Sequence, residues 1–101
     1  MTKRNFARRR VRCENGEDAA LLYRILEERE DGITRYGAEI FLRRGGKTER
    51  AAVRDVTSSC RAIRGLLTLL SENTVTPCTL RDVVEDVLNN SEKGVDNLWL
   101  V

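Results

Sequence analysis

Three carboxylates near the C-terminal end of the chain have a spacing that could do chemistry. Asp82, Glu85 and Asp86 occupy positions i, i+3 and i+4, which share one face of a helix. Such a group could chelate a divalent cation or work as a general acid and base. Hard-cation sites usually collect ligands from several segments, so we interpret the three acids as a solvated helix face. The sequence therefore predicts no metal site and no catalytic pair there.

The other reactive side chains do not predict an enzyme either. The chain contains no histidine, which removes the commonest general base and transition-metal ligand. Cys13, Cys60 and Cys78 are odd in number and form no C-x-x-C pair, which argues against a disulfide framework or a zinc site. We interpret Cys60 and Cys78 as small buried hydrophobic residues. We predict a protein without catalytic residues or cofactor, in the reducing cytoplasm.

The start of the chain is strongly basic and carries no acid before Glu14. Its cluster of candidate nucleic-acid contacts consists of Arg8, Arg9, Arg10 and Arg12, since cationic side chains neutralise phosphates. Phe6 is the sole aromatic residue among them, so base stacking is poorly supported. The stretch has no apolar periodicity. We therefore predict residues 1–18 to be a flexible basic arm, and we prefer a solvated tail over a functional nucleic-acid-binding arm.

Two turns organise the middle of the chain into strands. Asp31-Gly32 separates strands at 20–28 and 33–43, and Gly45-Gly46 precedes a third strand at 47–56. Two-residue turns fix the register of the hairpins. On one face this register pairs apolar residues, namely Ile25–Ala38, Tyr23–Ile40, Leu21–Leu42, Ile40–Ala51 and Ala38–Val53. On the other face it pairs opposite charges, Arg24–Glu39 and Glu28–Arg35.

The second face of this predicted sheet also carries an apolar patch. Leu22 lies opposite Phe41, with Leu26 nearby. A single-layer sheet would leave this patch in contact with water. Either the end of the chain, Leu98–Val101, or a partner molecule could cover the patch, and the sequence does not decide between these two alternatives. We take Leu22, Leu26, Phe41 and Trp99 as the candidate interaction patch.

Two amphipathic helices complete the predicted fold. Thr57-Ser58-Ser59 opens a helix that runs to about Ser71, and a second helix follows Pro77. The fold class is α+β, a three-stranded antiparallel meander followed by two helices packed on one face, in the order β-β-β-α-α. The predicted divisions are the arm at 1–18, a single domain at 19–90 and a C-terminal tail at 91–101, which ends in an apolar segment.

A pattern in the second helix resembles a known family. Val75, Pro77, Leu80 and the run Asp82-Val83-Val84-Glu85-Asp86 read V-x-P-x-x-L-x-D-V-V-E-D. This is similar to the closing signature of an uncharacterised family of short bacterial proteins, mostly from anaerobic Gram-positive lineages, known as a domain of unknown function. The similarity runs from Leu21 to Leu88 and leaves both ends of the chain outside. It implies no activity, ligand or functional residue.

The sequence as a whole predicts a binding protein and not an enzyme. We expect a small cytoplasmic protein-interaction or regulatory module whose partner is another protein or a second copy of the chain. The alternative is a nucleic-acid-binding accessory protein that uses the basic arm. No apolar run approaches the ~20 residues of a membrane span, so we expect no membrane partner.

Overall fold

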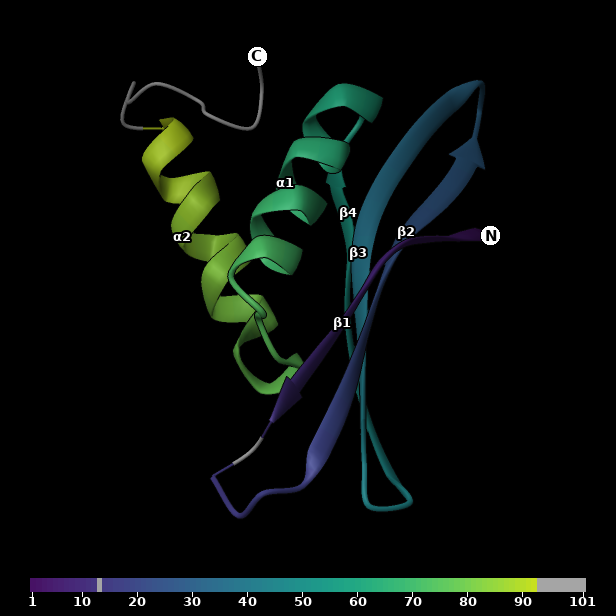
Figure 1. Cartoon of the computed structure of the whole chain (residues 1–101). Helices are drawn as coiled ribbons and strands as arrows, with labels where there is room; N and C mark the ends of the chain where they lie inside the picture. Colours follow the sequence, from purple (N-terminus) through teal and green to yellow (C-terminus); the bar gives the residue numbers. More distant parts are fainter. Residues whose placement is uncertain (13, 93–101) are drawn as a thin grey trace.

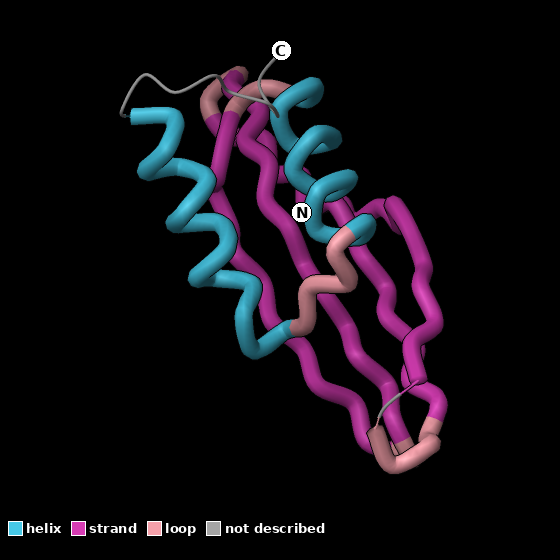
Figure 2. Tube along the Cα trace, turned by 60° about the vertical axis from the view of Figure 1, so that its left-hand side comes forward, coloured by secondary structure: helices cyan, strands magenta, loops and turns pink. Residues whose placement is uncertain are grey.

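The computed structural model of the protein describes residues 1–12 and 14–92. Along this part of the chain the elements are β1 (Thr2–Arg12), β2 (Asp18–Glu30), β3 (Ile33–Arg44), β4 (Lys47–Thr57), α1 (Cys60–Glu72), the 3-10 turn η1 (Pro77–Thr79) and α2 (Leu80–Glu92). The strands form one antiparallel sheet in the order β1-β2-β3-β4. Both helices cover the same face of that sheet, which gives an α+β fold of two layers (Figures 1 and 2). Neither described helix has the length and apolar character that a membrane span needs.

The prediction of three strands is wrong, because the stretch expected to be a flexible arm contains the edge strand β1. This strand runs antiparallel to β2, from Thr2 opposite Glu27 to Arg12 opposite Asp18. In Figure 1 it is the purple strand, which lies at the edge of the sheet beside β2. The fold is therefore a four-stranded meander followed by two helices, and its first strand is the basic one.

A strand so rich in arginine forms because its few apolar residues share one buried face. The residues of β1 that pack partly buried against the core are Phe6, Ala7 and Val11. Arginine can lie along apolar surface with its stem while its guanidinium stays in water, so the charges do not prevent pairing. The turn signal was Asn15-Gly16, the kind of dipeptide that favours a hairpin, and Gly16 has φ of 85°.

The register predicted for the other three strands is confirmed. The observed partners are Ile25–Ala38, Tyr23–Ile40 and Leu21–Leu42 between β2 and β3, and Ile40–Ala51 and Ala38–Val53 between β3 and β4. Asp31 and Gly32 have φ of 52° and 78°, as a type I′ turn requires. A shift of one residue would turn each apolar row to the opposite face, so burial and turn geometry select the same register.

The helix-side face of the sheet forms the hydrophobic core. Its fully buried side chains come from β2, β3 and both helices and include Leu21, Tyr23, Ala38, Ile40, Ile63, Leu66, Leu67, Leu70, Leu80 and Val84. α1 contacts all four strands, whereas α2 packs against β4. α1 begins after Ser59, whose hydroxyl accepts a hydrogen bond from the Ala62 amide at 3.1 Å.

Tyr23 ties the connection between the helices to the sheet. Its side chain is fully buried, and its hydroxyl donates a hydrogen bond to the carbonyl oxygen of Val75 at 2.9 Å. Burial raises the pKa of Tyr23 to about 12, and the charge of Arg9 acts in the opposite direction. Val75 lies just before η1, so this bond fixes where the chain turns into α2.

Replacing Tyr23 by Phe tests this contact. The lost hydrogen bond should lower the free energy of unfolding by ~0.5–1.5 kcal/mol at neutral pH. The folded pKa of about 12 exceeds the ordinary value of 10.0, so the contribution of Tyr23 is full below pH 10 and is lost as the pH rises toward 12. In urea titrations, wild type should lose on the order of 2–3 kcal/mol over that interval through this group. An equal loss in Tyr23→Phe would contradict the assignment.

Deleting residues 1–12 separates a strand from an arm. A flexible arm could be removed at no cost, whereas loss of β1 uncovers the core beside Phe6 and Val11 and the edge of β2. Fully buried residues of this size contribute about 1.5–3 kcal/mol each, against a total stability of ~5–15 kcal/mol. We expect the truncated protein to lose its cooperative thermal transition in circular dichroism. Arg12→Ser is the control and should change stability by less than about 1 kcal/mol. An unchanged melting temperature after truncation would contradict the role of β1.

Candidate interaction face

The face of the sheet opposite the helices, termed the outer face, carries most of the exposed basic side chains of the strands. Residues on this face alternate with the helix-side residues along the strands, except where the register shifts, between Asn5 and Ala7 of β1 and between Tyr36 and Ala38 of β3. The members that matter below are Lys3, Arg8 and Arg10 of β1, Ala20, Leu22, Arg24 and Leu26 of β2, Glu39, Phe41 and Arg43 of β3, and Arg50 of β4. No described helix lies on this side, as Figure 2 shows.

A groove crosses the outer face from β1 to β4. Ala20, Leu22 and Phe41 form its apolar floor, Arg8 and Arg10 line it on the β1 side, and Arg43 lines it from β3. Its volume is about 550 Å³. Leu22 and Phe41 are half-buried, and both line the groove.

The groove brings together two sites that the sequence placed apart. Arg8 lies opposite Leu22 in the β1–β2 register, and Leu22 lies opposite Phe41 in the next pair of strands. Arg8 and Arg10 of the candidate nucleic-acid residues are therefore neighbours of Leu22 and Phe41 of the candidate apolar patch on one surface. Sequence reasoning missed the contribution of Arg43, although its place two residues after Phe41 on the same strand puts both on one face.

The structure describes three more of the predicted site residues. Arg9 is in register with Leu21, a helix-side residue, although it also borders the groove. Arg12 ends the strand and pairs with Asp18 at 3.4 Å, where both side chains are exposed. Leu26 is on the outer face but is only 2% exposed. Trp99 and the rest of the C-terminal segment lie outside the described residues.

A buried carboxylate lies beside the groove. Glu39 is 0% exposed although it belongs to the helix-free face. Its Oε2 is 2.5 Å from Nε of Arg50 and 3.6 Å from Nζ of Lys3, and its Oε1 is 3.6 Å from a terminal nitrogen of Arg24. Three strands thus direct cations at one carboxylate. The Arg24–Glu39 pair was predicted from the register, but its burial depends on the side chains from β1 and β4.

Arg24 links this charge cluster to the groove. Its guanidinium carbon lies 5.6 Å from the centroid of the Phe41 ring, in the geometry of a cation–π contact. Nε of Arg24 and Oε1 of Glu39 are buried without a hydrogen-bond partner among the described residues. The ionic contact between the two residues is therefore looser than the Arg50–Glu39 hydrogen bond. Arg24 therefore contacts both Glu39 and the ring of Phe41.

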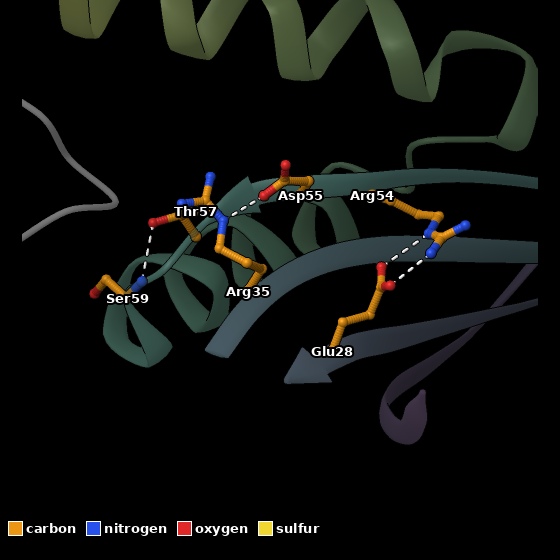
Figure 3. A network of polar contacts seen from close by, with 6 residues as sticks. All are labelled: Glu28, Arg35, Arg54, Asp55, Thr57 and Ser59. Atoms are coloured by element: carbon orange, nitrogen blue, oxygen red, sulfur yellow. Dashed lines mark hydrogen bonds and ion pairs between the residues drawn. The ribbon is translucent and has the colours of Figure 1, made fainter. Parts of the chain in front are cut away.

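A second polar network lies at the other end of the outer face (Figure 3). Nε and a terminal nitrogen of Arg54 donate to the two carboxylate oxygens of Glu28 at 2.8 and 2.5 Å, and Arg35 pairs with Asp55. The hydrogen bonds from Arg54 hold the pKa of Glu28 below its usual value. Glu28 and Arg35 are opposite each other as predicted, but their ion pairs run to β4. Each arginine named here already has a carboxylate partner.

The carboxylates and cysteines with reactive potential are dispersed. Asp82, Glu85 and Asp86 are all exposed on α2, and the described residues contain no group of three or more side chains placed to hold a metal ion. The prediction that Cys60 and Cys78 are buried is wrong, since both are exposed. Each lies at the start of a helical segment. The exposure of its side chain follows from this place at the end of the helix and not from the apolar stripe of the helix.

Comparison with protein-family models gives one result. Residues 2–90 match the model described as "Family of unknown function (DUF6514)". The chain belongs to this family. No curated protein and no solved structure matches it.

The extent of the DUF6514 match bears on the fold. It begins at residue 2, the first residue of β1, so the basic strand lies inside the region that the family model describes. The resemblance noted from the sequence had left this stretch outside. Within the pattern that carried the resemblance, Pro77, Leu80 and Val84 are buried and the acids are exposed, so in this DUF6514 member it positions α2 on the core.

Glu39 and Glu49 give a matched test of the buried carboxylate. Glu49 is an exposed acid of β4, and its replacement by Ala should change the free energy of unfolding by less than about 0.5 kcal/mol. Glu39→Ala removes the partner of three cations and leaves an unfilled buried site, which should cost about 1–3 kcal/mol. Urea denaturation of both variants measures the difference. Equal small effects would show that the charge cluster does not contribute to stability.

Proposed function

We propose that this DUF6514 protein is a non-catalytic protein-interaction module that binds an acidic segment of a partner protein in the groove of the outer face. The observation that carries the proposal is the pairing of an apolar floor, formed by Leu22 and Phe41, with arginines on two sides of it. A carboxylate-bearing chain with one apolar anchor complements such a groove in both shape and charge.

The charge distribution supports an acidic ligand. The whole chain has a formal net charge of +2. The outer face between the β1–β2 turn and Leu26 concentrates cations, with Glu39 as the acid among them: Lys3, Arg8, Arg10, Arg24, Arg43 and Arg50. The positive potential of this face would steer an acidic partner toward the groove and raise its association rate.

The apolar floor supports a protein partner in particular. Interfaces draw most of their binding energy from a few large side chains that are desolvated at the centre, with charged residues around them. Phe41 and Leu22 occupy that central place in the groove, and Arg8, Arg10 and Arg43 surround them. A second copy of the chain is a poorer partner, because two outer faces placed together would oppose arginine to arginine.

Single-stranded nucleic acid is the second candidate, and the arginines of the groove favour it. Sheet faces that bind single strands stack successive bases on several aromatic side chains. Among the described residues the groove offers Phe41 alone, and Arg24 already lies over that ring. Base stacking thus has little support on this face.

The proposed function also includes a location. We place the protein in the cytoplasm, in keeping with three cysteines that form no C-x-x-C pair.

A binding comparison tests the proposed function. The probes are a fluorescein-labelled peptide of alternating Glu and Leu residues and labelled oligothymidylate, followed by fluorescence anisotropy at physiological salt. We expect the peptide to bind more tightly. Phe41→Ser should weaken peptide binding tenfold or more, which corresponds to ~1.4 kcal/mol, because it removes the central anchor. Arg43→Ser should weaken it a few-fold.

Arg81→Ser is the matched control for the loss of one charge. Arg81 is an exposed cation on α2, away from the outer face, and its replacement should leave peptide binding unchanged. Circular dichroism of each variant checks the fold. Tighter binding of oligothymidylate than of the peptide would replace the proposed function by the nucleic-acid one. Failure of both probes to bind would contradict the use of this groove for anionic ligands.

A further inference from the structure

The six outer-face cations between the β1–β2 turn and Leu26 that are named above fall into two groups with different surroundings. Lys3, Arg24 and Arg50 each lie within 3.6 Å of the Glu39 carboxylate. Arg8, Arg10 and Arg43 line the groove instead. The first group surrounds a carboxylate that solvent does not reach, and the second group faces the space where a ligand would lie.

Glu39 therefore changes what the first group can do. The single negative charge of Glu39 offsets one of the three positive charges around it, so Lys3, Arg24, Arg50 and Glu39 together present a net charge of about +2 to an approaching anion. Each of these cations must also give up its contact with Glu39 before it can bind a phosphate directly, which would weaken the pairing of a desolvated carboxylate. Arg50 shows the strength of this hold, since its Nε is 2.5 Å from the Glu39 carboxylate although half of its side chain is exposed.

We propose that Glu39 is a selectivity-determining residue that makes the outer face discriminate against nucleic acid. By occupying Lys3, Arg24 and Arg50, it confines the cations that a ligand can use to the groove. A short acidic protein segment needs only those, because its apolar anchor supplies the rest of its affinity. A nucleic acid strand gains affinity with each phosphate that is neutralised, so it binds less tightly to a face on which three cations are engaged by Glu39. This inference rests on the proposed function and adds the means by which the partner class is chosen.

The test compares Glu39→Gln with Glu49→Gln. Both variants remove one negative charge from the sheet, but Glu49 is exposed and outside the cluster. Binding of oligothymidylate and of the Glu/Leu peptide is measured by anisotropy over a series of salt concentrations. Glu39→Gln should tighten oligothymidylate binding several-fold more than Glu49→Gln does. It should also steepen the fall of log K with log salt by roughly 0.7 for each released cation that reaches a phosphate. The peptide should gain less, so the preference for peptide should shrink.

A second pair of variants keeps the test valid if Glu39→Gln does not fold. Arg50 belongs to the group held by Glu39, and Arg10 belongs to the groove. Arg10→Gln should weaken oligothymidylate binding and flatten its salt dependence, whereas Arg50→Gln should have a clearly smaller effect on both. Equal effects of these two replacements, or equal effects of the two glutamate replacements, would overturn the role of Glu39. A wild-type protein that does not bind the peptide would instead contradict the proposed function, so the two failures are distinguishable.

Discussion

Backbone pairing between β1 and β2 positions residues on both faces of the sheet, the helix side and the outer face. On the helix side the pairing brings Phe6 and Val11 against the core and gives α1 a fourth strand to cover. On the outer face the same pairing sets Lys3 and Arg8 beside the apolar and acidic residues of β2 and β3. Without β1, the groove would lose one wall and Glu39 would lose one of its cations.

The two faces of the sheet are stabilised by different kinds of interaction. The helix side is an apolar core. Within it, the hydrogen bond from the hydroxyl of Tyr23 to the carbonyl oxygen of Val75 fixes the position of the chain just before η1 and α2. The outer face has no covering layer among the described residues, and long basic side chains shield its acid and its apolar floor from water. That arrangement leaves a groove with a half-buried aromatic ring and arginines on two sides. The core consists of apolar side chains, whereas the outer face combines charged side chains with a small apolar floor.

Much of the fold followed from the sequence, and the errors have physical causes. Asp31-Gly32 and Gly45-Gly46 fix the register of three strands, because each turn and the apolar alternation agree. The prediction of an arm is wrong because arginine counts as a polar residue in the sequence, although its long apolar stem can lie along apolar surface. A strand rich in such side chains shows no clear alternation of apolar and polar residues. Asn15-Gly16 was the available signal for that hairpin. The pairing of Arg24 with Glu39 was predictable, but its burial was not, since the cover comes from strands that are distant in sequence.

Amide hydrogen exchange of residues 2–12, followed by NMR in the full-length protein, tests the central place of β1 most directly. In an antiparallel edge strand, amides that point toward β2 are hydrogen-bonded and those that point away are not. We therefore predict alternating protection along β1, with the inward amides exchanging as slowly as those of β2 and β3. Uniformly fast exchange across this stretch would mean that it is a flexible arm after all, and the groove and the cation cluster of Glu39 would lose their basis.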